Sequence, residues 1–109
     1  MATLHSDDTD ARAPLQALID ASWTTQAIRA ACLLDLPEQL ASGVQDLAAL
    51  AAATHSDAAA LRRLLRALAT IGLCIESGAN RFALTPSGAL LCGEHPQSLR
   101  AWALQVGGS

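Results

Sequence analysis

Thiol and imidazole side chains come close together at one place in the sequence, where two residues separate Cys92 from His95. A pair at this spacing supplies half of many zinc sites, which need four ligands. A second pair is missing, because Cys32 and Cys74 stand far apart and both fall in apolar runs. We therefore expect no metal site and three reduced cysteines, as is usual for cytosolic proteins.

Three of the seven arginines, Arg62, Arg63 and Arg66, lie within five residues of one another. Such a cluster on one helix can touch a phosphate backbone, so a winged-helix DNA-binding transcriptional regulator is the alternative function. The segment that would enter the groove begins with Ser56-Asp57, however, which presents a carboxylate to the phosphates. The net charge is −3. We expect a solvated or salt-bridged arginine face and no nucleic-acid partner.

Catalysis by this chain alone has little support in the sequence. No Ser, Thr, His or acidic residue stands at a spacing tied to a known activation mechanism, and there is no glycine-rich phosphate or dinucleotide loop. A chain of 109 residues is also too short for a complete nucleotide-binding α/β enzyme. We expect no catalytic, cofactor-binding or metal-binding residues here, and we interpret the aromatic residues Trp23, Phe82 and Trp102 as core more readily than as pocket lining.

The composition predicts a mainly helical domain. The chain contains 24 Ala and 19 Leu but only six Val and Ile, and few β-branched residues argue against a sandwich or barrel. Residues 1–13 are acidic and without period, so we expect a disordered tail. They lack the basic start of a signal peptide, and the longest apolar run, residues 47–53, is too short for a membrane span. A cytoplasmic protein that binds no membrane is expected.

The first predicted helix covers residues 14–34, with Pro14 in its first turn. Apolar residues recur along it at steps of three and four on two faces, and a short chain has few other helices to cover both. We therefore expect one face to bind a second copy of the chain. The predicted dimer-interface residues are Leu18, Trp23, Ile28 and Cys32.

The remaining pattern predicts a helix-turn-helix over residues 45–71, with Ser56 as the cap of its second helix and Gly72 as its stop. A β-hairpin, the wing, follows over residues 73–84. Thr85 and Pro86 then open a helix over residues 86–91, and a last helix covers 97–106. This order predicts a mainly α, winged-helix-like domain with a small β-hairpin, spanning residues 14–109.

A resemblance to a known family rests on several segments taken in order: Leu33–Gly43, Asp46–Ala48, Leu61–Leu68, Ile71–Leu73, Arg81–Gly88 and Ser98–Trp102. Together they resemble the N-terminal domain of bacterial S-adenosylmethionine-dependent small-molecule O-methyltransferases, the relatives of plant O-methyltransferases. The resemblance implies a winged-helix dimerisation module that interlocks with a second copy. It also implies that the module helps to wall the pocket of an aromatic or polyketide-type acceptor, while a following α/β domain transfers the methyl group.

The same resemblance implies that the catalytic domain is absent from this chain. None of His5, His55 and His95 matches the catalytic base of the family, so the chain is not expected to be catalytic by itself or to bind S-adenosylmethionine, the cofactor implied for the full-length enzyme. Trp102 and Gln105 are the predicted residues of the acceptor wall. The alternative for Trp102 is a place in the core.

Overall fold

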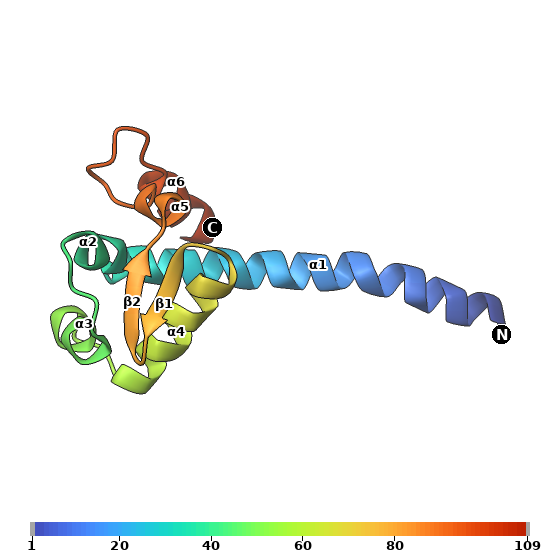
Figure 1. Ribbon diagram of the computed structural model, residues 1–109. Helices are drawn as coiled ribbons and strands as arrows, with labels where there is room; N and C mark the ends of the chain where they lie inside the picture. Colours follow the sequence, from blue (N-terminus) through green and yellow to red (C-terminus); the bar gives the residue numbers. More distant parts are fainter. Residues whose placement is uncertain (1, 109) are drawn as a thin grey trace.

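A computed structural model describes residues 2–108, without the side chains of residues 2–11, 18, 20 and 106–108. It has a mainly helical body from which one long helix projects (Figure 1). The elements are α1 (Ala2–Leu33), α2 (Leu36–Ala41), α3 (Leu47–Thr54), α4 (Ala58–Thr70), β1 (Cys74–Gly78), β2 (Arg81–Leu84), α5 (Pro86–Ala89) and α6 (Arg100–Gly108). The mainly α fold with a two-stranded antiparallel hairpin is confirmed.

The start of α1 differs from the prediction. Helical backbone begins at Ala2, where we expected a tail without structure, and Pro14 lies inside the helix. Proline removes one backbone hydrogen bond from a helix interior, but residues 2–33 contain no glycine and are rich in alanine. Each residue added to a helix that is already formed gains a hydrogen bond, so the helix continues on both sides of the proline.

Of the helix signals predicted after α1, those of Thr85, Pro86 and Gly72 are confirmed. Thr85 caps α5 by accepting a hydrogen bond from the Gly88 amide, and Pro86 fills its first turn. Gly72 follows α4 with φ +83°, a left-handed conformation that suits glycine. The predicted cap Ser56 is wrong, because the Asp57 carboxylate accepts from the Ala60 amide, at 2.9 Å.

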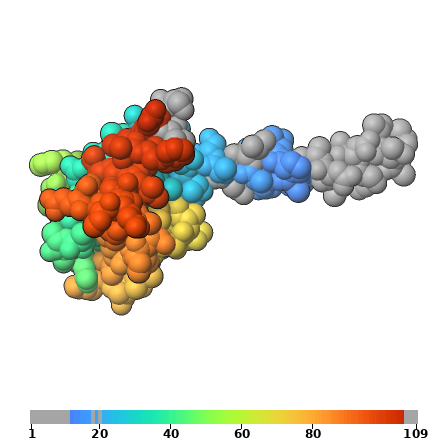
Figure 2. All heavy atoms as spheres, turned by 90° about the horizontal axis from the view of Figure 1, so that it is seen from above, coloured from blue at the N-terminus to red at the C-terminus, as the bar shows by residue number. Residues whose placement is uncertain are grey.

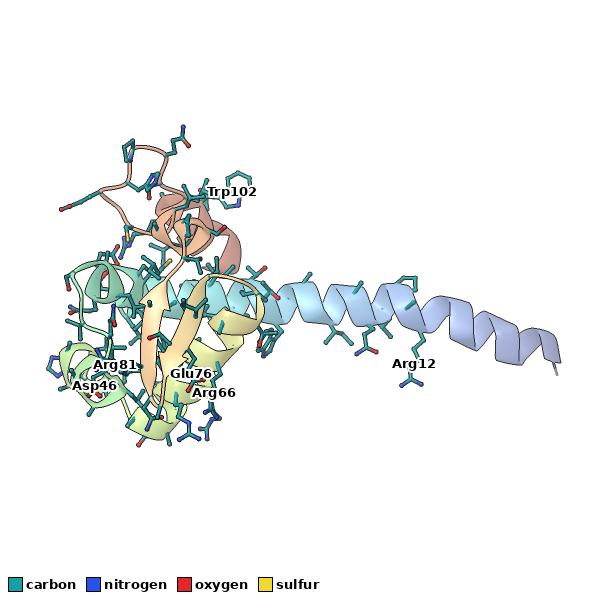
Figure 3. The ribbon with its side chains drawn as sticks, in the orientation of Figure 1. Arg12, Asp46, Arg66, Glu76, Arg81 and Trp102 are labelled. Atoms are coloured by element: carbon teal, nitrogen blue, oxygen red, sulfur yellow. The ribbon has the colours of Figure 1, made fainter. Side chains whose placement is uncertain are left out.

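The hairpin is fixed next to α3 through its turn and β2. Cys74 of β1 pairs with Leu84 of β2, and the turn contains Asn80 at φ +55°. The Leu47 amide donates to the Asn80 carbonyl, at 2.9 Å, and Asp46 forms an isolated bridge with Arg81. Figure 3 shows these last two side chains together at the lower edge of the body. The hairpin therefore has a set position relative to α3.

The core lies where α4, α3, α2 and the hairpin meet the second half of α1. Phe82 of β2 is fully buried at its centre. On α1 the core face consists of the small residues Ala27 and Ala31, which let the other helices approach closely. A second, smaller cluster joins α1 to the C-terminal part of the chain and contains Cys32, Leu91 and Ala103.

Helix α6 begins at Arg100, three residues later than predicted. Before it, residues 92–98 form successive turns, in which the His95 Nδ1 atom accepts from the Gln97 amide, at 2.9 Å. The Ser98 hydroxyl oxygen then accepts from the Arg100 amide, at 3.1 Å, and satisfies one donor of the first helical turn. Figure 1 shows α6 lying across α1, and these two helices share the main contact of the C-terminal segment.

Candidate functional site

The projecting half of α1 carries an apolar stripe, which we call the α1 stripe, formed by Leu15, Ile19 and Trp23. These side chains are spaced by four residues, so they lie on one side of the helix. Leu15 and Ile19 are each 59% exposed and Trp23 is 50% exposed. Figure 2 shows this part of the helix extending from the body. Large apolar side chains so exposed on a bare helix indicate a surface for another protein chain.

The α1 stripe leads into a hollow between α1 and α4. This hollow has a volume of about 470 Å³ and is lined by Trp23, Gln26, Ala27, Arg63, Leu64 and Ala67. Four of these lining residues, Trp23, Ala27, Leu64 and Ala67, are apolar. A side chain of a bound helix could enter here, so the apolar surface of α1 continues onto the body.

The four predicted interface residues are not on one surface. Trp23 belongs to the α1 stripe, and the side chain of Leu18 lies outside the described residues. Ile28 is half-buried and packs against both core clusters. Cys32 is fully buried, so its assignment to an interface is wrong: α6 folds back over α1 and covers it.

The outer side of α6 is a second exposed apolar surface. Trp102 is 69% exposed and points away from the body in Figure 3, and Gln105 is also exposed. The alternative that Trp102 belongs to the core of this chain is therefore wrong. Beside it is an open hollow of about 170 Å³, lined by Thr25, Ile28, Leu91, Leu99, Trp102 and Ala103. Because pockets for drug-sized ligands measure roughly 300–1,000 Å³, this hollow is large enough for part of a ligand only.

An ion-pair network that sequence reasoning missed lies at the start of α6. Arg100 donates to Asp35, at 2.9 Å, and its Nε atom lies 3.4 Å from Glu38 Oε1. It also donates to the backbone carbonyl of Cys32, at 3.2 Å. The sequence signal for this network was weak, because acidic residues 62 and 65 positions before an arginine indicate contact only once the fold is known.

The arginine cluster of α4 faces solvent, as expected. Arg66 forms an ion pair with Glu76 of the hairpin, at 3.3 Å, and the two lie side by side in Figure 3. Arg62 and Arg63 are exposed. At the N-terminus of α4, the Asp57 carboxylate occupies the position where a recognition helix would meet DNA. This geometry does not favour the DNA-binding alternative.

Burial raises the pKa values of all three cysteine thiols. It raises the pKa of Cys74 to about 11, and Glu76 adds to the rise. Burial also raises the pKa of Cys32, against the opposing effect of Arg100, and the pKa of Cys92. All three therefore favour the neutral thiol, which is a poor nucleophile and metal ligand. Among the described residues, no group of three His, Cys, Asp or Glu side chains is placed to hold a metal ion.

No helix in the described part of the chain combines the length and the apolar character that crossing a membrane requires.

Comparison with known proteins gives the family. The model of the O-methyltransferase dimerisation domain matches residues 16–94. The O-demethylpuromycin-O-methyltransferase of Streptomyces alboniger is 37% identical over 101 residues, which are 93% of this chain and 27% of that protein. The aclacinomycin 10-hydroxylase RdmB of Streptomyces purpurascens is 38% identical over 82 residues, or 72% of this chain and 22% of that protein.

Solved structures of methyltransferases also match this chain. The O-methyltransferase NcsB1 from neocarzinostatin biosynthesis, in complex with S-adenosyl-L-homocysteine, matches with a TM-score of 0.75 and 34% identity, over 84% of this chain and 30% of that chain. It has also been solved with S-adenosylmethionine and 2-hydroxy-5-methyl naphthoic acid. The chain thus spans about a quarter of the length of the curated relatives that it matches. From its fold, its exposed apolar helix and these matches, the chain belongs to the O-methyltransferase dimerisation domain family.

Proposed function

We propose that this chain is the dimerisation and acceptor-pocket module of a small-molecule O-methyltransferase, and that it acts with a catalytic domain and a second copy of itself in the cytoplasm. The observation that carries the proposal is the α1 stripe, in which three large apolar side chains are each at least half exposed. Membership of the dimerisation family supports a second copy of the chain as the cover for these side chains. The winged-helix description of α3, α4 and the hairpin belongs to the same proposal.

The free energy gained by burying the α1 stripe indicates how large the dimer interface must be. Burying the exposed half of three large side chains in each of two copies is worth roughly 5–9 kcal/mol. Association costs about 4–15 kcal/mol in lost translational and rotational freedom, so the α1 stripe by itself does not ensure a stable dimer. We therefore extend the interface into the hollow beside Trp23, where Leu64 and Ala67 of α4 add apolar surface.

We assign the acceptor wall to the outer side of α6. The Trp102 indole offers a flat apolar face on which an aromatic acceptor can stack, and the Gln105 amide can donate to or accept from a polar substituent. The hollow beside Trp102 is too small for a whole acceptor, so the catalytic domain would supply the other walls. The naphthoic acid bound to NcsB1 supports an aromatic, natural-product type of acceptor.

We assign methyl transfer to the catalytic domain, with S-adenosylmethionine as the donor. NcsB1, with its bound S-adenosyl-L-homocysteine, supports this cofactor for the complete enzyme. The described residues of this chain contribute apolar and hydrogen-bonding surface to the acceptor. One relative, RdmB, is named as a hydroxylase and not as a methyltransferase. The reaction of the complete enzyme should therefore be tested directly. Labelled methyl transfer from S-adenosylmethionine to a naphthoic acid by the complete enzyme is the expected result.

Light scattering on the 109-residue chain tests dimerisation. At micromolar concentration we expect the mass of two chains. Ile19→Glu places a charge in the middle of the α1 stripe and should give a monomer with unchanged helical circular dichroism. Ala17→Glu is the matched control, because it adds the same charge to the same helix at an exposed position on the side away from the α1 stripe, and it should remain dimeric. A parent chain that stays monomeric up to 100-fold higher concentration would refute the dimer.

A further inference from the structure

Arg100, the first residue of α6, is bound to oxygen atoms from two other helices and the turn between them. Its Nη2 atom donates to Asp35 Oδ1, at 2.9 Å, and to the Cys32 carbonyl, at 3.2 Å. Its Nε atom lies 3.4 Å from Glu38 Oε1. The planar guanidinium can serve these three acceptors at once, which a lysine ammonium on a flexible stem does less well.

The acceptors of Arg100 belong to a sharp turn between α1 and α2. Asp35 occupies the left-handed region, with φ +55° and ψ +30°, and so interrupts the helical path between the end of α1 and the start of α2 at Leu36. A non-glycine residue there is uncommon and indicates a constrained position. Glu38 Oε1 also accepts from the Gly93 amide, at 3.2 Å, and so holds the loop that leads to α6. One network therefore fixes both the turn and the loop.

A second arginine holds the same helix one turn further on. The Nε atom of Arg29 in α1 lies 3.4 Å from the carbonyl oxygen of Leu104. Between the two arginine contacts, Ala103 is buried against Cys32 in the smaller core cluster. Trp102, the residue before it, is 69% exposed and lines the same hollow as Ala103. Its direction is therefore set by how α6 lies on α1.

We propose that Arg100 is the positioning residue of the acceptor wall: its contacts with Asp35, Glu38 and the Cys32 carbonyl fix the direction of α6 and thereby hold Trp102 and Gln105 in place. The wall itself rests on the function proposed above. Without Arg100, the first turn of α6 keeps its apolar contact with α1 through Ala103 and loses the contacts that set its direction. Trp102 then moves with the N-terminal end of α6, while the Arg29 contact still holds Leu104 one turn further on.

The test uses the 109-residue chain with Trp23→Phe, which leaves Trp102 as its single tryptophan. Adding Arg100→Ala should increase the amplitude of nanosecond motion in the fluorescence anisotropy decay of Trp102. Amide hydrogen exchange in α6 should become about tenfold faster, whereas exchange in α4 stays within about twofold. Arg66→Ala is the matched control, because it removes an ion pair of the same kind between α4 and the hairpin, and it should leave Trp102 unchanged.

Two further results separate this inference from the proposed function. If Arg100→Ala lowers overall stability too far, the double variant Asp35→Asn and Glu38→Gln removes the acceptor charges and should free α6 in the same way. Unchanged Trp102 motion, or exchange accelerated equally in α4 and α6, overturns the positioning role. In the complete enzyme, an acceptor KM that Trp102→Ala does not change overturns the acceptor wall, while the anchoring of α6 by Arg100 would stand.

Discussion

At the scale of single residues, the buried thiol of Cys74 gives the chain an unusual alkaline titration. The Cys74 side chain is 1% exposed and its thiol donates to the Leu65 carbonyl, at 3.3 Å. Burial raises its pKa from 9.0 to about 11. The folded state therefore keeps the proton that the unfolded state releases, so this contribution to stability is complete below pH 9 and disappears as the pH rises through 11.

The expected loss between pH 9 and pH 11 is roughly 2–3 kcal/mol in the free energy of unfolding, from a shift of about two pKa units. The sequence contains no lysine and no tyrosine, so the other side chains that contribute in the alkaline range are the buried Cys32 and the half-buried Cys92, whose pKa values burial also raises. Urea unfolding at several pH values measures the effect, and in Cys74→Ala the slope should become smaller, with the remainder due to Cys32 and Cys92. Equal slopes in the parent and in Cys74→Ala would contradict the assignment to this thiol.

At the scale of helices and strands, two neighbouring residues, Ser56 and Asp57, were candidates for the N-terminal cap of α4. Both Ser56 and Asp57 are good capping residues, and only the backbone conformation decides which one is used. The Asp57 carboxylate accepts from the Ala60 amide, whereas Ser56 hydrogen-bonds with Thr54. Asp57→Ala should lower the free energy of unfolding by about 1 kcal/mol. Asp57→Asn should cost less, and a larger loss from Ser56→Ala than from Asp57→Ala in urea unfolding would reverse the assignment.

The elements that the sequence predicted well are those with local signals. Thr85, Pro86 and Gly72 each determine a boundary through their own backbone preferences, and the hairpin needed only its two short runs and the turn at Asn80. The start of α6 was less predictable, because the turns after Cys92 depend on hydrogen bonds of His95 and Ser98. For α1, the periodic spacing of apolar residues begins only near Pro14, whereas the helical backbone already begins at Ala2. The apolar pattern therefore did not predict the true start of this helix.

At the scale of the whole molecule, the predictions failed where long-range packing decides exposure. Trp23 and Cys32 both lie on apolar faces of α1 in the sequence, but α6 covers Cys32 and leaves Trp23 half exposed. The apolar pattern of α1 alone cannot show that α6, which is separated from it by the 66 residues 34–99, packs against it. For the same reason the Arg100 network was missed. What the sequence did indicate correctly was the excess of apolar surface on α1 relative to the small body.

The exposed indole of Trp102 leads to a last prediction, in which stability and acceptor binding separate. Truncating a buried aromatic side chain costs about 3–5 kcal/mol, as we expect for Phe82→Ala, the matched control with a fully buried ring. Because Trp102 is 69% exposed, Trp102→Ala should lower the unfolding free energy of the 109-residue chain by less than about 1 kcal/mol.

In the complete enzyme the same change, Trp102→Ala, should raise the acceptor KM severalfold and alter kcat less, since a wall residue binds the ground state and the transition state alike. A stability loss equal to that of Phe82→Ala would instead make Trp102 a packing residue, and urea unfolding of the two variants side by side decides between these outcomes.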